Sequence, residues 1–174
     1  MRLLLGLALL LLPGQALADA CGPRLVVTFA EGAPADRFTL FNASDPGWSV
    51  TEVEIDLGPS QGRLIFDVTE RGAGLSVYQP FEEVLGGAVI ANRTDVGDGD
   101  SVMTMEFSRF VSGETFAFTI DLDDTAGFAP TVVSADEIAE GRIRARFTSA
   151  GGGDATREAY FDATSEADTG RFEA

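Results

Sequence analysis

The sequence of 174 residues has no histidine and no lysine, and it contains one cysteine and one tryptophan. Without histidine, the chain cannot build a Ser-His-Asp triad or a histidine-ligated zinc site. Without lysine, it can form neither a Schiff base nor the phosphate contacts of a P-loop. Carboxylates, arginines, hydroxyl groups and the backbone remain, and these suit carboxylate-pair hydrolysis, calcium binding or no catalysis at all.

Basic residues of any kind are few, since twelve arginines stand against 28 acidic residues and give a formal net charge of −16. A charge of this sign and size repels nucleic acid and anionic membrane surfaces. Neither is therefore an expected partner.

Long apolar runs are also scarce, and the longest, Leu3–Leu12, lies at the N-terminus ahead of the small-residue pattern Ala16-Leu17-Ala18. This order is typical of a bacterial secretory signal peptide over residues 1–18, cleaved before Asp19. Ten apolar residues are too few for a membrane-spanning helix, which needs about 20. We expect a secreted chain without a transmembrane segment. Removal of the leader leaves eleven arginines against 28 acidic residues, a net charge of −17.

The single cysteine, Cys21, closely follows this leader and cannot form an intramolecular disulfide. A bacterial lipoprotein would carry its lipid on such a cysteine, but Ala18 stands where those leaders normally have a leucine-like residue, and the acidic Asp19 is atypical. An unpaired thiol near the mature N-terminus is the expectation, with lipid anchoring at Cys21 as the alternative.

Short segments that alternate apolar and polar residues, separated by glycine, proline and aspartate, dominate the rest of the chain. This period of two is typical of antiparallel strands that bury one face. It predicts a single all-β domain over residues 19–164, an antiparallel β-sandwich with a jelly roll as one candidate topology, followed by a flexible acidic tail over residues 165–174. The predicted strands are Leu25–Ala30, Arg37–Phe41, Trp48–Leu57, Gly62–Val68, Leu75–Tyr78, Val102–Phe110, Glu114–Leu122, Thr131–Val133, Gly141–Thr148 and Thr156–Asp162.

Two local patterns interrupt the strands. The apolar phase changes inside Trp48–Leu57, which predicts a β-bulge near Thr51 and Glu52. Ser134 followed by Glu137 three residues later has the spacing of a capping box, so one short helical turn is expected there.

Three acidic residues on one strand face, Glu52, Glu54 and Asp56, resemble the nucleophile strand of jelly-roll β-glucanases. A retaining glycosidase needs two carboxyl groups about 5–5.5 Å apart. Here Gly58 or Pro59 occupies the position expected for the acid/base, and the solvated face of a half-buried strand is the simpler interpretation. The sequence predicts no enzymatic activity.

Acidic loops are the second candidate for function. Their carboxylates are spaced one to three residues apart beside turn-forming residues, which would allow several oxygens to converge on calcium. An EF-hand is excluded because its ligand and glycine positions do not match. The alternative is ordinary solvated turns, since aspartate and glycine favour turns for backbone reasons. The candidate ligands are Asp121, Asp123, Asp124, Asp56, Asp95, Asp98 and Asp100.

Several segments resemble the secreted bacterial proteins called aggregation factor core proteins, namely Phe38–Asn42, Gly47–Leu57, Gly62–Asp67 and above all Phe110–Asp123. The last carries the pattern Phe-x-x-Gly-Glu-x-Phe-x-Phe-x-Ile-Asp-x-Asp. The resemblance implies an extracellular β domain in calcium-assisted adhesion or surface association.

The sequence thus favours a secreted, non-enzymatic β-sandwich that binds calcium weakly and contacts an extracellular protein or polysaccharide surface. The alternatives are a carbohydrate-binding or degenerate glucanase-like domain, for which Trp48, Tyr78 and Tyr160 would supply the aromatic contacts, and an acidic structural protein without a small ligand. Three arginines alternate along another predicted strand, where they are expected to keep a sheet edge soluble: Arg142, Arg144 and Arg146.

Overall fold

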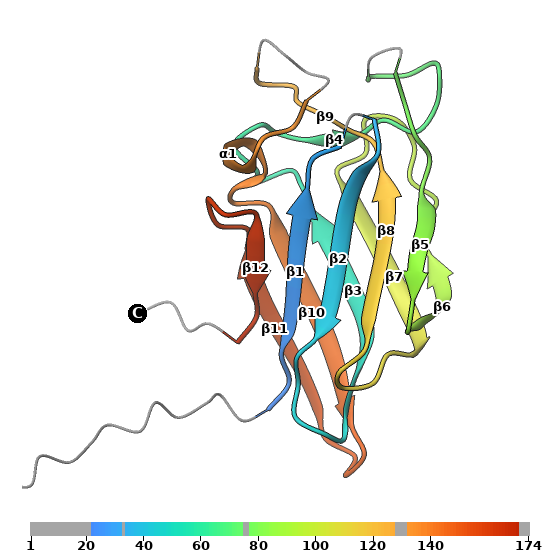
Figure 1. Ribbon diagram of the computed structural model, residues 1–174, viewed down its shortest axis with the longest axis vertical. Coiled ribbons are helices and arrows are strands. Elements are labelled where there is room, and N and C mark those ends of the chain that lie inside the picture. The colour runs from blue at the N-terminus through green and yellow to red at the C-terminus, as the bar shows by residue number, and fades with distance from the viewer. Residues whose placement is uncertain (1–21, 33, 75–76, 128–131, 171–174) are drawn as a thin grey trace, which may run out of the picture.

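The structure is a computed structural model that describes residues 22–32, 34–74, 77–127 and 132–170. The predicted signal peptide over residues 1–18 and Cys21 lie outside these described residues. The chain forms two five-stranded antiparallel sheets packed face to face, with a small third sheet at one end (Figure 1). The predicted all-β sandwich is confirmed.

Sheet A, in front in Figure 1, contains in spatial order β12 (Glu166–Asp168), β1 (Leu25–Ala30), β2 (Asp36–Asn42), β8 (Thr115–Ile120) and β5 (Glu82–Gly86). Sheet B lies behind it with β11 (Asp154–Tyr160), β10 (Arg142–Ser149), β3 (Trp48–Asp56), β7 (Val102–Arg109) and β6 (Val89–Arg93). At the upper end, β4 (Ile65–Phe66) pairs with β9 (Leu122–Asp123), and α1 (Ala135–Ile138) lies nearby.

The core lies between the sheets, and β8 shows how the alternating pattern builds it. Phe116, Phe118 and Ile120 are fully buried, as the period of two predicts. The ring of Phe118 stacks on Phe38 with centroids 5.2 Å apart and on Phe81 with centroids 4.7 Å apart. Phe38 belongs to β2 and Phe81 directly precedes β5, so these aromatic contacts tie both sides of β8 to the interior.

Both predicted interruptions are present. The register between β10 and β3 shifts so that Thr51 is the extra residue of a bulge, between Val50 and Glu52. Ser134 caps α1, and its side chain and that of Glu137 make the reciprocal hydrogen bonds of a capping box. These local predictions are confirmed.

Other elements differ from the expectation. No strand forms within residues 77–78 or 132–133, the described parts of two predicted strands. The edge strands β5 and β6 were not anticipated, because every residue of β5 and most of β6 are exposed rather than alternately buried. The segment expected as a flexible tail contributes β12, which pairs with β1, while residues 171–174 lie outside the described residues.

Candidate metal centre

Three buried carboxylates meet at the upper end of the sandwich. Asp67 follows β4, Asp121 separates β8 from β9, and Asp123 ends β9. One oxygen from each lies within 4.8 Å of the other two, and the exposed fractions of these residues are 0%, 3% and 3%. We call this group the acidic cluster.

The β4–β9 pairing creates the acidic cluster. The backbone N–H of Asp67 donates to the carbonyl oxygen of Asp121 at 3.0 Å, and Phe66 pairs with Leu122. Successive strand residues point to opposite faces, so Leu122 enters the core while Asp121 and Asp123 project together from the other side. A two-residue strand pair thus brings together carboxylates that are far apart in the sequence.

A fourth buried carboxylate, Asp36, begins β2 beside the acidic cluster. Its oxygens accept hydrogen bonds from the backbone N–H groups of Gly32 at 3.0 Å and Leu122 at 3.1 Å. Burial raises the pKa of Asp36 to about 7, although these two hydrogen bonds oppose the shift. Asp36 thus adds negative charge to the surroundings of the cluster when it ionises.

The pKa of Asp121 is raised to about 8, first by burial and then by the charges of Asp36, Asp123 and Asp67. Taking several like charges out of water is unfavourable unless protons or a cation neutralise them. The chain therefore holds a group of oxygens whose ionised form favours a bound cation.

Loop residues pack closely on these carboxylates. A Cβ atom at Gly74 would lie only 2.2 Å from the carboxyl carbon of Asp67, so any larger residue would displace that side chain. Gly74 therefore lets the loop over residues 68–74 fold back against the acidic cluster.

Asp124 is buried next to the acidic cluster but is not one of its three members. Its Oδ1 accepts a hydrogen bond from the N–H of Ala126 at 2.6 Å, and its Oδ2 faces Gly127 and accepts none from the described residues. Asp124 therefore stabilises the turn that follows β9.

The remaining predicted ligands lie elsewhere. Asp98 accepts hydrogen bonds from Thr69 Oγ1 and the N–H groups of Val68 and Thr69, and the bond from the Thr69 hydroxyl lowers its pKa. Asp100 accepts from the N–H of Gly97, and Asp95 lines a separate hollow. Asp98 and Asp100 thus hold loop backbone. The structure brings Asp121 and Asp123 together among the predicted ligands.

Sequence reasoning did not single out Asp67 or Asp36. Asp67 directly follows the apolar run Leu64-Ile65-Phe66, as Asp121 directly follows Ile120. In both cases a carboxylate directly follows a buried apolar run. Because strand ends on one side of a sandwich lie close together, this shared position was the signal that could have predicted Asp67 and Asp121 as neighbours.

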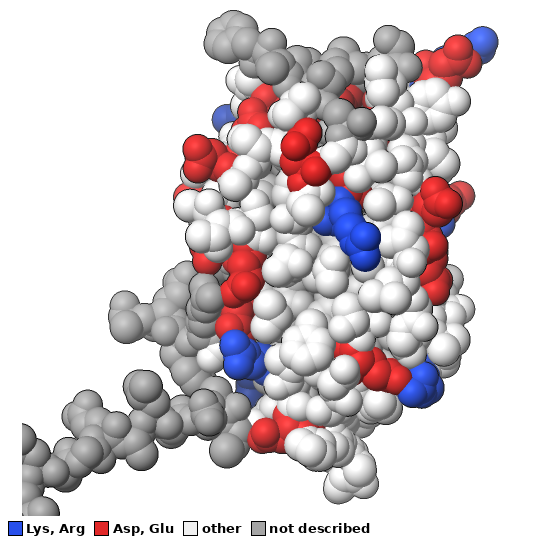
Figure 2. All heavy atoms as spheres, in the orientation of Figure 1, with Lys and Arg blue, Asp and Glu red and all other residues white. Residues whose placement is uncertain are grey.

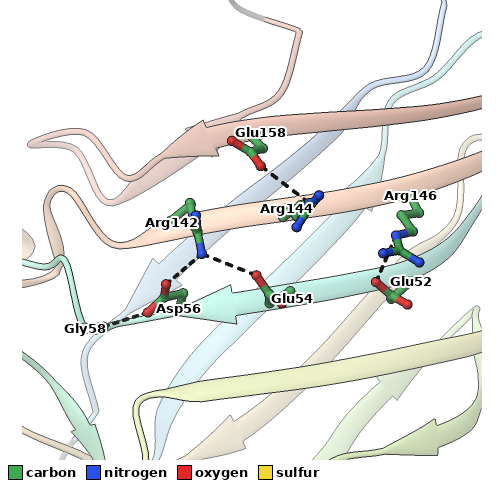
Figure 3. Close-up of polar contacts among 8 residues, drawn as sticks. All are labelled: Glu52, Glu54, Asp56, Gly58, Arg142, Arg144, Arg146 and Glu158. Atoms are coloured by element: carbon green, nitrogen blue, oxygen red, sulfur yellow. Dashed lines mark hydrogen bonds and ion pairs between the residues drawn. The ribbon is translucent and has the colours of Figure 1, made fainter.

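The last predicted ligand, Asp56, ends β3 and belongs to an ion-pair ladder on the outer face of sheet B (Figure 3). Arg142 lies 2.8 Å from Asp56 and 3.5 Å from Glu54. Arg144 lies 3.4 Å from Glu158, and Arg146 lies 3.3 Å from Glu52. The three arginines pair with acidic neighbours, but β10 lies between β11 and β3, so the prediction of an edge strand is wrong.

This ladder bears on the glucanase-like alternative. Arg142 contacts both Glu54 and Asp56, two carboxylates of the strand that resembles the glucanase nucleophile strand. Trp48 is partly buried against the core at the opposite end of β3 from Asp56. Tyr160, 47% exposed, pairs in register with Arg142. The indole is therefore distant from the carboxylates beside which a sugar would have to stack.

The chain matches no protein-family model, and no curated protein or solved structure matches it either. In the part of the chain that the structure describes, no helix is long and apolar enough to cross a membrane.

Proposed function

We propose that this protein is a secreted β-sandwich that binds calcium at the acidic cluster and serves adhesion or attachment at an extracellular surface. The observation that carries the proposal is the burial of Asp67, Asp121 and Asp123 with their oxygens within 4.8 Å of one another.

Calcium fits this arrangement better than magnesium does. Calcium accepts six to eight oxygen ligands in flexible geometry, and carboxylates that bind through one or both oxygens, such as the three of the acidic cluster, are ligands that it prefers. Magnesium demands near-octahedral geometry and gives up its water reluctantly. The cluster lies among strand ends and loops, where irregular ligand positions favour the larger ion.

Secretion and adhesion rest on the sequence. The leader-like pattern over residues 1–18 predicts export, and the run Phe110–Asp123 resembles the aggregation factor core proteins. Asp121 and Asp123 end that run, so the residues that carry the resemblance also supply two members of the acidic cluster. Extracellular modules bind calcium with dissociation constants of about 10⁻⁴–10⁻³ M.

Thermal denaturation with and without calcium tests this proposal. At about 10 mM, calcium is roughly 10- to 100-fold above the expected dissociation constant, which stabilises the native state by about 1.4–2.7 kcal/mol. For a domain of this size the melting midpoint should rise by roughly 3–11 °C. Magnesium should give a smaller rise.

Matched variants separate a specific site from screening of the net charge. The double variant Asp121→Asn, Asp123→Asn should lose most of the calcium shift, whereas Asp95→Asn, an exposed acid outside the cluster, should retain it. Sodium chloride of equal ionic strength should not reproduce the shift. If sodium chloride and calcium act equally, or if both sets of variants keep the shift, the acidic cluster is not a calcium site.

A further inference from the structure

The outer faces of the two sheets differ sharply in charge. On each face, the side chains that point outward from the three central strands lie side by side in three cross-strand rows, with one residue from each strand in a row. In sheet B, seven of these nine residues are charged, and in sheet A only Arg37 is. The sheet A residues are Val26, Thr28, Ala30, Arg37, Thr39, Phe41, Thr115, Ala117 and Thr119, and those of sheet B are Arg142, Arg144, Arg146, Glu52, Glu54, Asp56, Val102, Thr104 and Glu106.

Figure 2 looks onto the outer face of sheet A and shows its middle largely free of charged side chains, with most acidic groups towards the rim. A solvent-facing sheet normally carries polar and charged residues, and this chain is 23% charged overall. Phe41, 41% exposed, stands in the row between Val26 and Thr115. Depletion of charge together with an exposed aromatic residue is typical of the centre of a protein interface.

We propose that the outer face of sheet A docks a second copy of this chain, so that two copies pack face to face about a two-fold axis. Each copy carries a large negative charge, and copies that met through other acidic surfaces would repel each other. The outer face of sheet A brings almost no carboxylates together.

Arg37, the one charged residue among these nine, lies in the same cross-strand row as an acidic residue. Arg37 pairs in register with Thr119, and Thr119 pairs with Glu82 of β5. A two-fold axis can run parallel to β8, between the two facing sheets and midway between β2 and β5. It brings Arg37 of each copy opposite Glu82 of the other, which gives two such pairs in each dimer. The same operation places Thr39 opposite the exposed side chain of Leu85.

The size of the contact indicates which class of association to expect. About this axis, β2, β8 and β5 of one copy face β5, β8 and β2 of the other. Three strands spaced about 4.8 Å apart and six residues of about 3.4 Å each cover roughly 14 by 20 Å, about 290 Å² per copy. Stable dimers bury about 800 Å² per partner, so this smaller contact should be weak and reversible, with a dissociation constant of roughly 10⁻⁴–10⁻³ M. The short β12 and the irregular pairing of β5 disfavour edge-to-edge growth, which leaves a closed dimer.

Sedimentation velocity from about 10 µM to 1 mM, in calcium and in chelator, tests the proposal, with Thr39→Glu and Thr104→Glu as matched variants. Both threonines are half-buried in the middle cross-strand row of an outer face, one on each sheet, and both changes add one negative charge. At 1 mM about half or more of the wild-type and Thr104→Glu chains should be in dimers, so that their weight-average mass lies clearly above that of the monomer. Thr39→Glu should remain monomeric with an unchanged melting midpoint.

Phe41→Ser gives a second test that adds no charge, and it should weaken the dimer at least several-fold. Because none of the nine outward residues of sheet A belongs to the acidic cluster, the dimer should form in chelator too, and its failure would not bear on the calcium proposal. The proposal is wrong if the wild type stays monomeric up to 1 mM, or if Thr39→Glu and Thr104→Glu weaken association equally.

Discussion

Neutralising one buried carboxylate should stabilise the calcium-free protein at alkaline pH. Asp121→Asn keeps the size of the side chain but removes a charge from a cluster in which burial and neighbouring carboxylates raise the pKa of Asp121 to about 8. Asp36 behaves similarly, with a pKa of about 7. The ordinary value of both groups is 3.8.

The direction of the pH dependence follows from proton binding. Between about pH 4 and pH 8 the folded protein holds protons on Asp36 and Asp121 that the unfolded chain has released, so stability falls as the pH rises through this window. The contribution is fully present below pH 4 and lost above pH 8. Each pKa unit corresponds to about 1.4 kcal/mol, and relaxation around the charges reduces the total, so we expect a loss on the order of a few kcal/mol.

Urea denaturation in chelator at pH 5, 7 and 9 measures this effect. The wild type should lose stability between pH 5 and pH 9, and Asp121→Asn should lose less, so that it is the more stable protein at pH 9. Asp95→Asn is the control for one exposed charge. A wild type that gains stability from pH 5 to pH 9, or an Asp121→Asn variant that is less stable at pH 9, would refute this reasoning.

Three further predictions concern the core, the ladder and the N-terminus. Phe118→Ala should destabilise by about 3–5 kcal/mol in urea denaturation, and Thr119→Ala by less than about 1.5 kcal/mol, because the phenylalanine is fully buried between two other rings; equal losses would contradict the strand phase. Arg142→Gln should cost at most about 1 kcal/mol in the same assay, since its ion pairs are partly exposed. Intact mass after bacterial secretion should show a chain beginning at Asp19, whereas an acylated chain beginning at Cys21 would indicate a lipoprotein.

Strands with a strict period of two were predictable from the sequence. β8 is the clearest case, because its large apolar residues Phe116, Phe118 and Ile120 alternate with smaller ones and all three enter the core. The bulge at Thr51 and the capping box of α1 were equally predictable, because both depend on residues within a few positions of one another. Local periodicity and local hydrogen bonding carry this information.

Features that depend on distant pairing were not predictable in the same way. β5 and β6 carry no alternating burial, since they are edge strands held by one neighbour each in register-shifted pairs. The acidic cluster depends on the pairing of two-residue strands, and no local pattern identifies Asp67 as a neighbour of Asp121 and Asp123. The loops that hold Asp98 and Asp100 look like ligand loops in sequence, yet both carboxylates bind backbone N–H groups.

Locating the ion directly is the sharpest test of the proposed calcium site. Crystals grown in about 10 mM calcium, measured at a wavelength where calcium scatters anomalously, should show one peak with oxygens of Asp67, Asp121 and Asp123 at about 2.3–2.6 Å. Crystals of the double variant Asp121→Asn, Asp123→Asn should lack that peak. A peak that lies only among Asp95, Asp98 and Asp100, or no peak at the acidic cluster in crystals grown in calcium, would contradict the assignment.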